Sequence, residues 1–214
     1  MKKQLVIISL VAAVASFSAL GQGYMTFGGG KNSVFNGSTS TSGLGAGGAA
    51  AFLWALVGTA DPLGAGLSTS ATSAPFGWST LNSMTASGGW TWGVNNGTNG
   101  TAGQAIGTVN PSGLAVGGFV YNGAAPFQVV GTSAGTSYEI VAVAWNGAFG
   151  TSANLGWSSA FTYATGASAS DPTGTVNFSG NGMVPFGVAA VPEPTTMALA
   201  ALGGASLLLF RRKK

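Results

Sequence analysis

The chain of 214 residues carries few charges: 5% of its residues are Asp, Glu, Lys or Arg, against roughly 25% in an average soluble domain. Cysteine and histidine are absent, which excludes disulfides, thiol nucleophiles, zinc sites built from Cys and His, and catalytic triads that need His. Six of the seven positive residues lie at the two ends, so the body has one Lys, three acids and no basic face for nucleic acid.

The first 21 residues have the pattern of a secretion signal. Two lysines precede an uncharged apolar stretch, and Ala19 and Gly21 place small side chains at positions −3 and −1 before Gln22. This order of charge, apolar core and small-residue site is typical of a signal peptide that is removed during export. We therefore expect residues 1–21 to be cleaved. The alternative is an uncleaved N-terminal membrane anchor, for which the apolar stretch is short.

Residues 22–190 are predicted to form a β-rich exported domain. No segment combines a sustained apolar period of 3.6 residues with helix caps. Short apolar runs bounded by turn residues instead predict strands, at residues 50–57, 90–94, 115–121, 126–130, 137–145, 157–163, 173–178 and 183–190. Residues 28–48 and 64–73 hold few large apolar side chains and are expected to be loops or an N-terminal arm.

The segment 137–145 is the strongest of these strands. Both of its alternating faces are largely apolar, so we expect it to be central and covered on both sides. Two packed antiparallel sheets suit such a pattern. The predicted fold class is therefore all-β: a β-sandwich or jelly-roll-like domain, flanked by the signal peptide and a C-terminal transmembrane helix.

Two kinds of turn recur in the body. Asn-Gly pairs at 122–123 and 146–147 predict hairpins that return through 127–130 and 148–149, because both residues tolerate positive φ. The pattern Asp/Asn-Pro-x-Gly begins at Asp61, Asn110 and Asp171, where the first side chain caps the turn and Pro presets φ. Two of the body's three carboxylates are thereby expected to have a structural role.

The C-terminal tail, residues 191–214, has three parts. Its strip at residues 191–194 contains Pro192, Glu193 and Pro194, and the prolines keep it extended. Residues 195–210 carry no charge and would span about 24 Å as a helix, slightly less than the hydrocarbon core of a bilayer. Four cations follow and should hold the end of the chain in the cytoplasm; they are Arg211, Arg212, Lys213 and Lys214.

This three-part tail resembles the PEP-CTERM sorting signal of Gram-negative bacteria, also labelled the "ice-binding protein C-terminal" domain, a label that describes the tail alone. The resemblance implies processing near the Pro-Glu-Pro tripeptide by exosortase, a membrane-embedded cysteine protease or transpeptidase. It also implies an association with exopolysaccharide or biofilm matrix. The expected protein is anchored in the inner membrane by its C-terminal helix and then found in the cell envelope or outside the cell. The alternative is a plain membrane anchor.

The body offers little for catalysis. Its acids are Asp61, Glu139 and Asp171; two of these are assigned to turns, and no His is present to activate a serine. We expect no enzyme activity, no cofactor and no metal, and a solvated turn is favoured over a calcium site at Asp61 or Asp171.

A carbohydrate-binding module is the alternative function for the body. Trp90 and Trp92 stand at positions i and i+2, which share one face of a strand and would form a stacking platform for sugar rings. The competing interpretation is a pair of core aromatics, which the many Phe and Trp residues of the chain favour.

Overall fold

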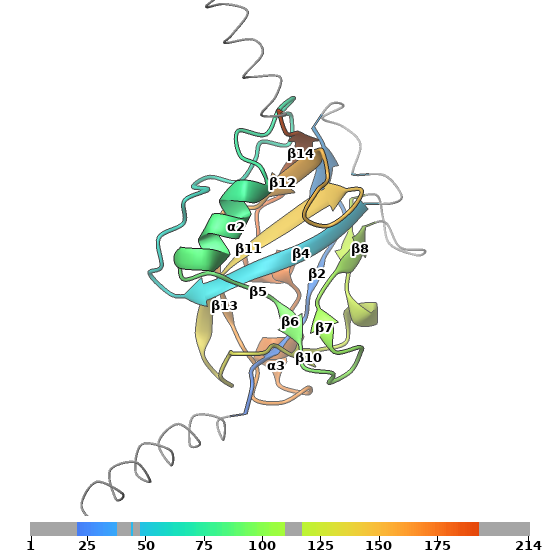
Figure 1. The fold of residues 1–214 in the computed structure, drawn as a ribbon. Helices are drawn as coiled ribbons and strands as arrows, with labels where there is room; N and C mark the ends of the chain where they lie inside the picture. The colour runs from blue at the N-terminus through green and yellow to red at the C-terminus, as the bar shows by residue number, and fades with distance from the viewer. Residues whose placement is uncertain (1–20, 38–43, 45–47, 110–116, 193–214) are drawn as a thin grey trace, which may run out of the picture.

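The computed structural model describes residues 21–37, 44, 48–109 and 117–192. At its centre lie two long antiparallel strands, β4 (Gly48–Leu56) and β11 (Ser137–Asn146), paired from Leu56 opposite Tyr138 to Gly48 opposite Asn146. Figure 1 shows this pair crossing the middle of the molecule, with the other strands curling away behind it.

Shorter strands extend the sheet from both long strands. The outer edge of β4 pairs with β5 (Thr91–Trp92) and β8 (Gly107–Val109), and the outer edge of β11 pairs with β12 (Asn154–Trp157) and β13 (Phe161–Ala164). Further strands complete a ten-stranded sheet: β9 (Phe119–Val120) and β2 (Gly28–Gly29) beyond β8, and β14 (Phe186–Ala190) and β3 (Val34–Asn36) beyond β12. Two small pairs stand apart from it, namely β1 (Tyr24–Met25) with β10 (Phe127–Gln128), and β6 (Val94–Asn95) with β7 (Gly103–Gln104).

The central strands bury both of their faces, as the sequence predicts for 137–145. One face contributes Tyr138, Ile140, Ala142 and Ala144 to a core that is rich in phenylalanine. The other contributes Val141, Val143 and Trp145 to a core that is rich in tryptophan. We call these the Phe core and the Trp core. The mostly β character of the chain is thereby confirmed.

The elements that cover the two cores differ from the two packed sheets of the expected sandwich. Ten of the described strands form one large curled sheet that encloses the Phe core, rather than two packed sheets of a sandwich. The Trp core is covered by a helix, α2 (Trp78–Ser87), which the sequence analysis missed. This helix buries Trp78, Leu81 and Met84, while its N-cap Gly77 has no capping side chain. Its first turn has no acid and its last turn no base, so the usual helix signals are absent.

A second prediction, the strand at 173–178, is wrong. That stretch forms the short helix α3 (Pro172–Thr175) and the 3₁₀ turn η2 (Phe178–Asn181). The side chain of Asp171 caps α3, and Pro172 fits the first helical turn. Likewise, the predicted strand 157–163 is two strands, β12 and β13, separated by residues 158–160.

Of the two predicted Asn-Gly turns, the one at 122–123 forms, within the 3₁₀ turn η1 (Asn122–Ala124), whereas Asn146 is still part of β11; neither segment returns along the expected partner. Asn122 and Gly123 adopt φ values of 52° and 64°, as a hairpin turn requires, yet β9 and β10 pair with other strands. Ala124 also has a positive φ of 66°, which directs the chain away from a hairpin. After Asn146 the chain does return antiparallel, but through β12 at residues 154–157 rather than through 148–149.

The carboxylates of Asp61 and Asp171 cap turns, as expected. The N–H of Leu63 donates to Asp61 Oδ1 at 2.9 Å, and burial raises the pKa of Asp61, with a smaller contribution from the charge of Glu139. The N–H of Ala167 donates to Asp171 Oδ2 at 2.8 Å; this bond and those from Thr173 lower the pKa of Asp171. The turn predicted at Asn110 lies outside the described residues.

The opposite pKa shifts predict opposite effects of one conservative change. Asp61→Asn keeps the oxygen that caps its turn but removes a charge that burial disfavours, so the melting temperature should rise at pH 7. Asp171→Asn removes one of two acceptor oxygens, so the melting temperature should fall at pH 7. Thermal melts at pH 7 and pH 3 test both changes. The Asp61→Asn difference should shrink at pH 3, where the raised pKa of Asp61 leaves its carboxyl group protonated, whereas the lowered pKa of Asp171 should preserve the Asp171→Asn difference to lower pH. Differences of the same sign at pH 7 would contradict the assignment.

A buried hydroxyl ties the first strands to the α3 region. Tyr163 Oη accepts the N–H of Thr26 at 3.0 Å and lies 2.9 Å from the carbonyl of Val176, to which it donates. Tyr163 is fully buried, and burial raises its pKa to about 12.

Tyr163→Phe should therefore destabilise the domain by about 1–3 kcal/mol, because the N–H of Thr26 is left without its acceptor. In the wild type, unfolded Tyr163 ionises near 10 and folded Tyr163 near 12, so its contribution to stability is lost as the pH rises through that interval. Urea unfolding between pH 7 and pH 11.5 tests this. The same change at half-buried Tyr24 is the control; an equal loss at both positions would contradict a special role for Tyr163.

Candidate functional site

The C-terminal tail leaves the domain at a well-anchored point. β14 lies between β12 and β3, with Ala190 opposite Asn154 and Phe186 opposite Val34. The carbonyl of Ala190 accepts the N–H of Ala74 at 2.9 Å, and the N–H of Val191 donates to Ala153 at 2.7 Å. The next residue, Pro192, is exposed. The chain thus changes from sheet to strip within two residues, with no linker between them.

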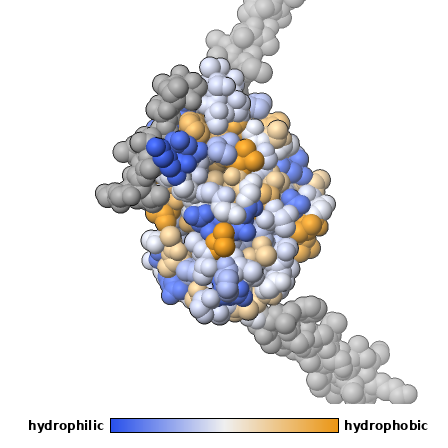
Figure 2. Space-filling model, turned by 180° about the vertical axis from the view of Figure 1, so that it is seen from behind, coloured by the Kyte–Doolittle hydropathy of each residue, from blue (hydrophilic) through white to orange (hydrophobic). Residues whose placement is uncertain are grey.

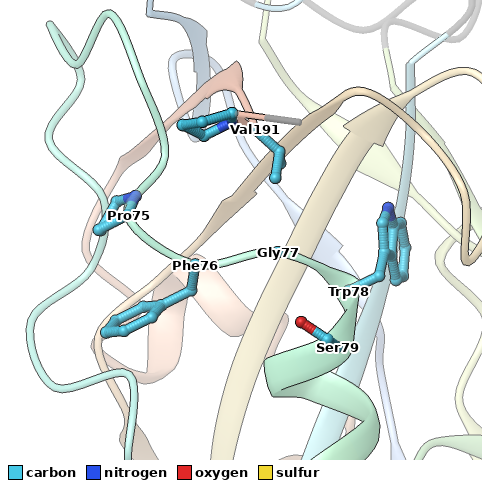
Figure 3. Close-up of a pocket in the computed structure, with 7 residues that line it drawn as sticks. Pro75, Phe76, Gly77, Trp78, Ser79 and Val191 are labelled. Carbon is cyan, nitrogen blue, oxygen red and sulfur yellow. The ribbon is translucent and has the colours of Figure 1, made fainter. Parts of the chain in front are cut away.

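A groove lies directly beside this exit (Figure 3). We call it the exit groove; its volume is about 570 Å³, and it is lined by Pro75, Phe76, Gly77, Trp78, Ser79, Val191 and Pro192. The rings of Phe76 and Trp78 flank the backbone of Gly77, and Val191 lies across from them. A Cβ at Gly77 would lie 3.0 Å from a methyl carbon of Val191, so glycine permits this close approach.

The start of the predicted mature chain lies at the other end of the molecule (Figure 1). Gly21, the expected last residue of the signal peptide, is exposed, and its carbonyl accepts the N–H of Ala134 at 2.9 Å. β1 begins at Tyr24, three residues later. Cleavage after Gly21 would therefore leave every described strand intact. Ala19 lies outside the described residues.

Most of the predicted sorting residues also lie outside the described part of the chain: Glu193, Pro194, residues 195–210, Arg211, Arg212, Lys213 and Lys214. Among the residues that the structure does describe, no helix is long and apolar enough to cross a membrane.

The structure packs both tryptophans of the predicted stacking platform against the Trp core. Trp90 is 2% exposed, and its Nε1 donates to the carbonyl of Ala60 at 2.9 Å. It precedes β5, and its backbone N–H bonds to Met84 O in α2. Trp92 is half-buried. A shared exposed face is therefore absent, and the core interpretation holds for Trp90.

Trp92 also belongs to an aromatic cluster, at the rim of the Trp core, that the sequence analysis did not find. Phe149, from the loop after β11, lies with its ring centroid 5.2 Å from Trp78, 5.3 Å from Trp92 and 5.3 Å from Trp145. Phe149 is 40% exposed. The Nε1 of Trp78 donates to Ser152 in the same loop, so this cluster adjoins the exit groove through Trp78. These aromatics are far apart in the sequence, and no local pattern could have grouped them.

The three acids of the body lie on turns and on β11. Within the described residues, no group of three Asp, Glu, Cys or His side chains is placed to hold a metal ion. Asp61 and Asp171 serve their turns, and Glu139 is half-buried on β11.

Comparison with known proteins bears on the tail alone. The family model of the PEP-CTERM protein-sorting motif matches residues 190–213, which begin at the last residue of β14. No curated protein and no solved structure matches the chain. The match confirms the resemblance drawn from the Pro-Glu-Pro strip, the apolar stretch and the terminal cations. The chain therefore carries a PEP-CTERM sorting signal, which marks it as an exported protein processed by exosortase.

Proposed function

We propose that this protein is a non-enzymatic component of the cell envelope or extracellular matrix, displayed by its tail and then released or transferred by exosortase. Residues 195–210 form the membrane anchor, and Arg211–Lys214 keep its end in the cytoplasm. Processing takes place in the strip at Pro192, Glu193 and Pro194. The β domain, which has few charges and many Ser, Thr and Asn side chains, then associates with exopolysaccharide through hydrogen bonds.

One observation carries this proposal: the fold ends where the sorting motif begins. Ala190 is the last residue of β14 and the first of the matched motif. Its carbonyl and the N–H of Val191 make the last described backbone bonds before the strip. A cut after Pro192 leaves every described strand and every described core side chain in place. The domain can therefore be detached from its anchor without being unfolded, as a displayed or released protein requires.

The first test is the intact mass of the protein from its native host, together with its distribution between membrane and medium. We expect a chain that begins near Gln22, ends between Pro192 and Thr195, and is found in the envelope or medium. Replacing Pro192, Glu193 and Pro194 with alanine should leave the tail uncut and the chain in the inner membrane. Replacing Pro62 with alanine is the control outside the strip. A wild-type chain that keeps its tail in the inner membrane would contradict the proposal.

The second test asks whether the domain is independent of its tail. A chain that ends at Pro192 should keep the free energy of unfolding of the longer chain to within about 0.5 kcal/mol, since it keeps every side chain of the described cores. A chain that ends at Val184 lacks β14, so β3 and β12 lose a partner and the Phe core loses Phe186 and Val188. It should show no cooperative unfolding in urea. Equal stability of the two truncations would contradict the role assigned to β14.

A further inference from the structure

The exit groove is close to the membrane because its tether is short. This step rests on the proposed function, in which residues 195–210 span the bilayer. Pro192 lines the groove, and two residues, Glu193 and Pro194, separate it from Thr195. A fully extended chain covers at most about 3.6 Å per residue, so Pro192 lies within roughly 11 Å of the span. The headgroup layer is itself about 5–8 Å thick on each side. The groove must therefore lie at, or just above, the lipid headgroups.

The chemistry of the groove suits that position. None of the residues that line it is charged, and five of the seven are Pro, Phe, Trp or Val. Pro75 and Pro192 are exposed and Phe76 is half-buried, so apolar surface is available at the rim. Aromatic side chains are enriched at membrane interfaces, and an uncharged surface approaches headgroups without the cost of desolvating ions.

The opposite side of the molecule is different. Figure 2 shows hydrophobic residues scattered singly over the rear face, among hydrophilic ones and without a broad apolar area. The end that carries α3 lies far from the end of β14 (Figure 1) and presents Asp171 with the exposed Ser168 and Ser170. Among the surfaces described, apolar character and proximity to the tether coincide at the exit groove.

We propose that the exit groove is a membrane-contact surface, which seats the anchored domain on a neutral phospholipid bilayer until the tail is cut. Phe76 lies at headgroup level, and the α3 end points away from the membrane. Lipid is favoured over the processing enzyme as the occupant, because the tether holds the groove against lipid before any enzyme arrives. Since the groove residues carry no charge, the contact is apolar and insensitive to salt.

The absence of cysteine allows a direct test with single labels. The full chain with its tail is reconstituted into phosphatidylcholine vesicles as Ser79→Cys or Ser170→Cys, each labelled with an environment-sensitive fluorophore. Ser79 is exposed and lines the groove, whereas Ser170 is exposed at the α3 end. Spin-labelled lipid, with the spin label near the headgroup, is then added as a quencher. We expect blue-shifted emission and strong quenching at position 79, and neither effect at position 170. Both results should persist at high salt.

Flotation of the vesicles distinguishes failure of the proposed function from failure of the membrane-contact inference alone. A chain that does not float with the vesicles has no anchor, and the proposed function fails together with this inference. A chain that floats but shows equal, weak quenching at both positions keeps its anchor and overturns the inference alone; the groove would then be free for the processing enzyme. Adding Phe76→Ser to the Ser79→Cys chain should reduce the quenching. The folding control is the Ser170→Cys chain with the same Phe76→Ser change, whose cooperative urea unfolding would show that the domain is folded. Unchanged quenching in a folded Phe76→Ser chain would also overturn the inference.

Discussion

The structure depends on the pairing of β4 with β11. These strands are adjacent along nearly their whole length, although about 90 residues separate them in the sequence, and each buries side chains on both faces. A strand that is buried on both faces needs other elements packed against each face, and these elements differ between the two faces here. The curled sheet closes over the phenylalanines, while α2 and its flanking loops close over the tryptophans. With so few charged residues available, apolar burial on these two faces and backbone hydrogen bonds supply most of the stabilisation.

The position of the exit follows from this arrangement. β12 pairs with one half of β11, β14 pairs with β12, and the segment before α2 bonds to the end of β14 through Ala74. The N-terminus of α2 and the start of the tail therefore meet at one edge of the Trp core, where Gly77 permits close contact with Val191. The sorting strip begins at a rigid point beside an uncharged groove.

Local sequence patterns correctly predicted the structural features that depend on interactions between neighbouring residues. The apolar runs at 50–57 and 137–145 are strands, the Asp-Pro turns are capped as expected, and the tail was recognised because its signal is linear and independent of packing. The failures have tertiary causes. α2 is held by Trp78, Leu81 and Met84 against the sheet rather than by caps. Residues 173–178 alternate like a strand, yet Asp171 and Pro172 begin a helix there.

Pairings between distant segments were also beyond the reach of the sequence alone. Trp90 and Trp92 pack against a core that also holds Trp78 from α2 and Trp145 from β11, which their spacing in the sequence does not indicate. The Trp78–Phe149 contact joins a helix to a loop some 70 residues away, and no pattern within either segment indicates it. The function of the β domain therefore had to be inferred from the surface of the folded structure. Export of the protein, by contrast, could be predicted from the sequence of the tail.

The parallel pairing of β14 with β3 has a consequence for the order of events during export. Phe186 lies opposite Val34, so one of the first strands to emerge waits for the last one, about 150 residues later. In the proposed topology the sheet cannot close until residue 190 has emerged, when the apolar stretch at residues 195–210 is next to follow. Completion of the fold and anchoring of the chain would then nearly coincide, so the domain would fold while it is anchored.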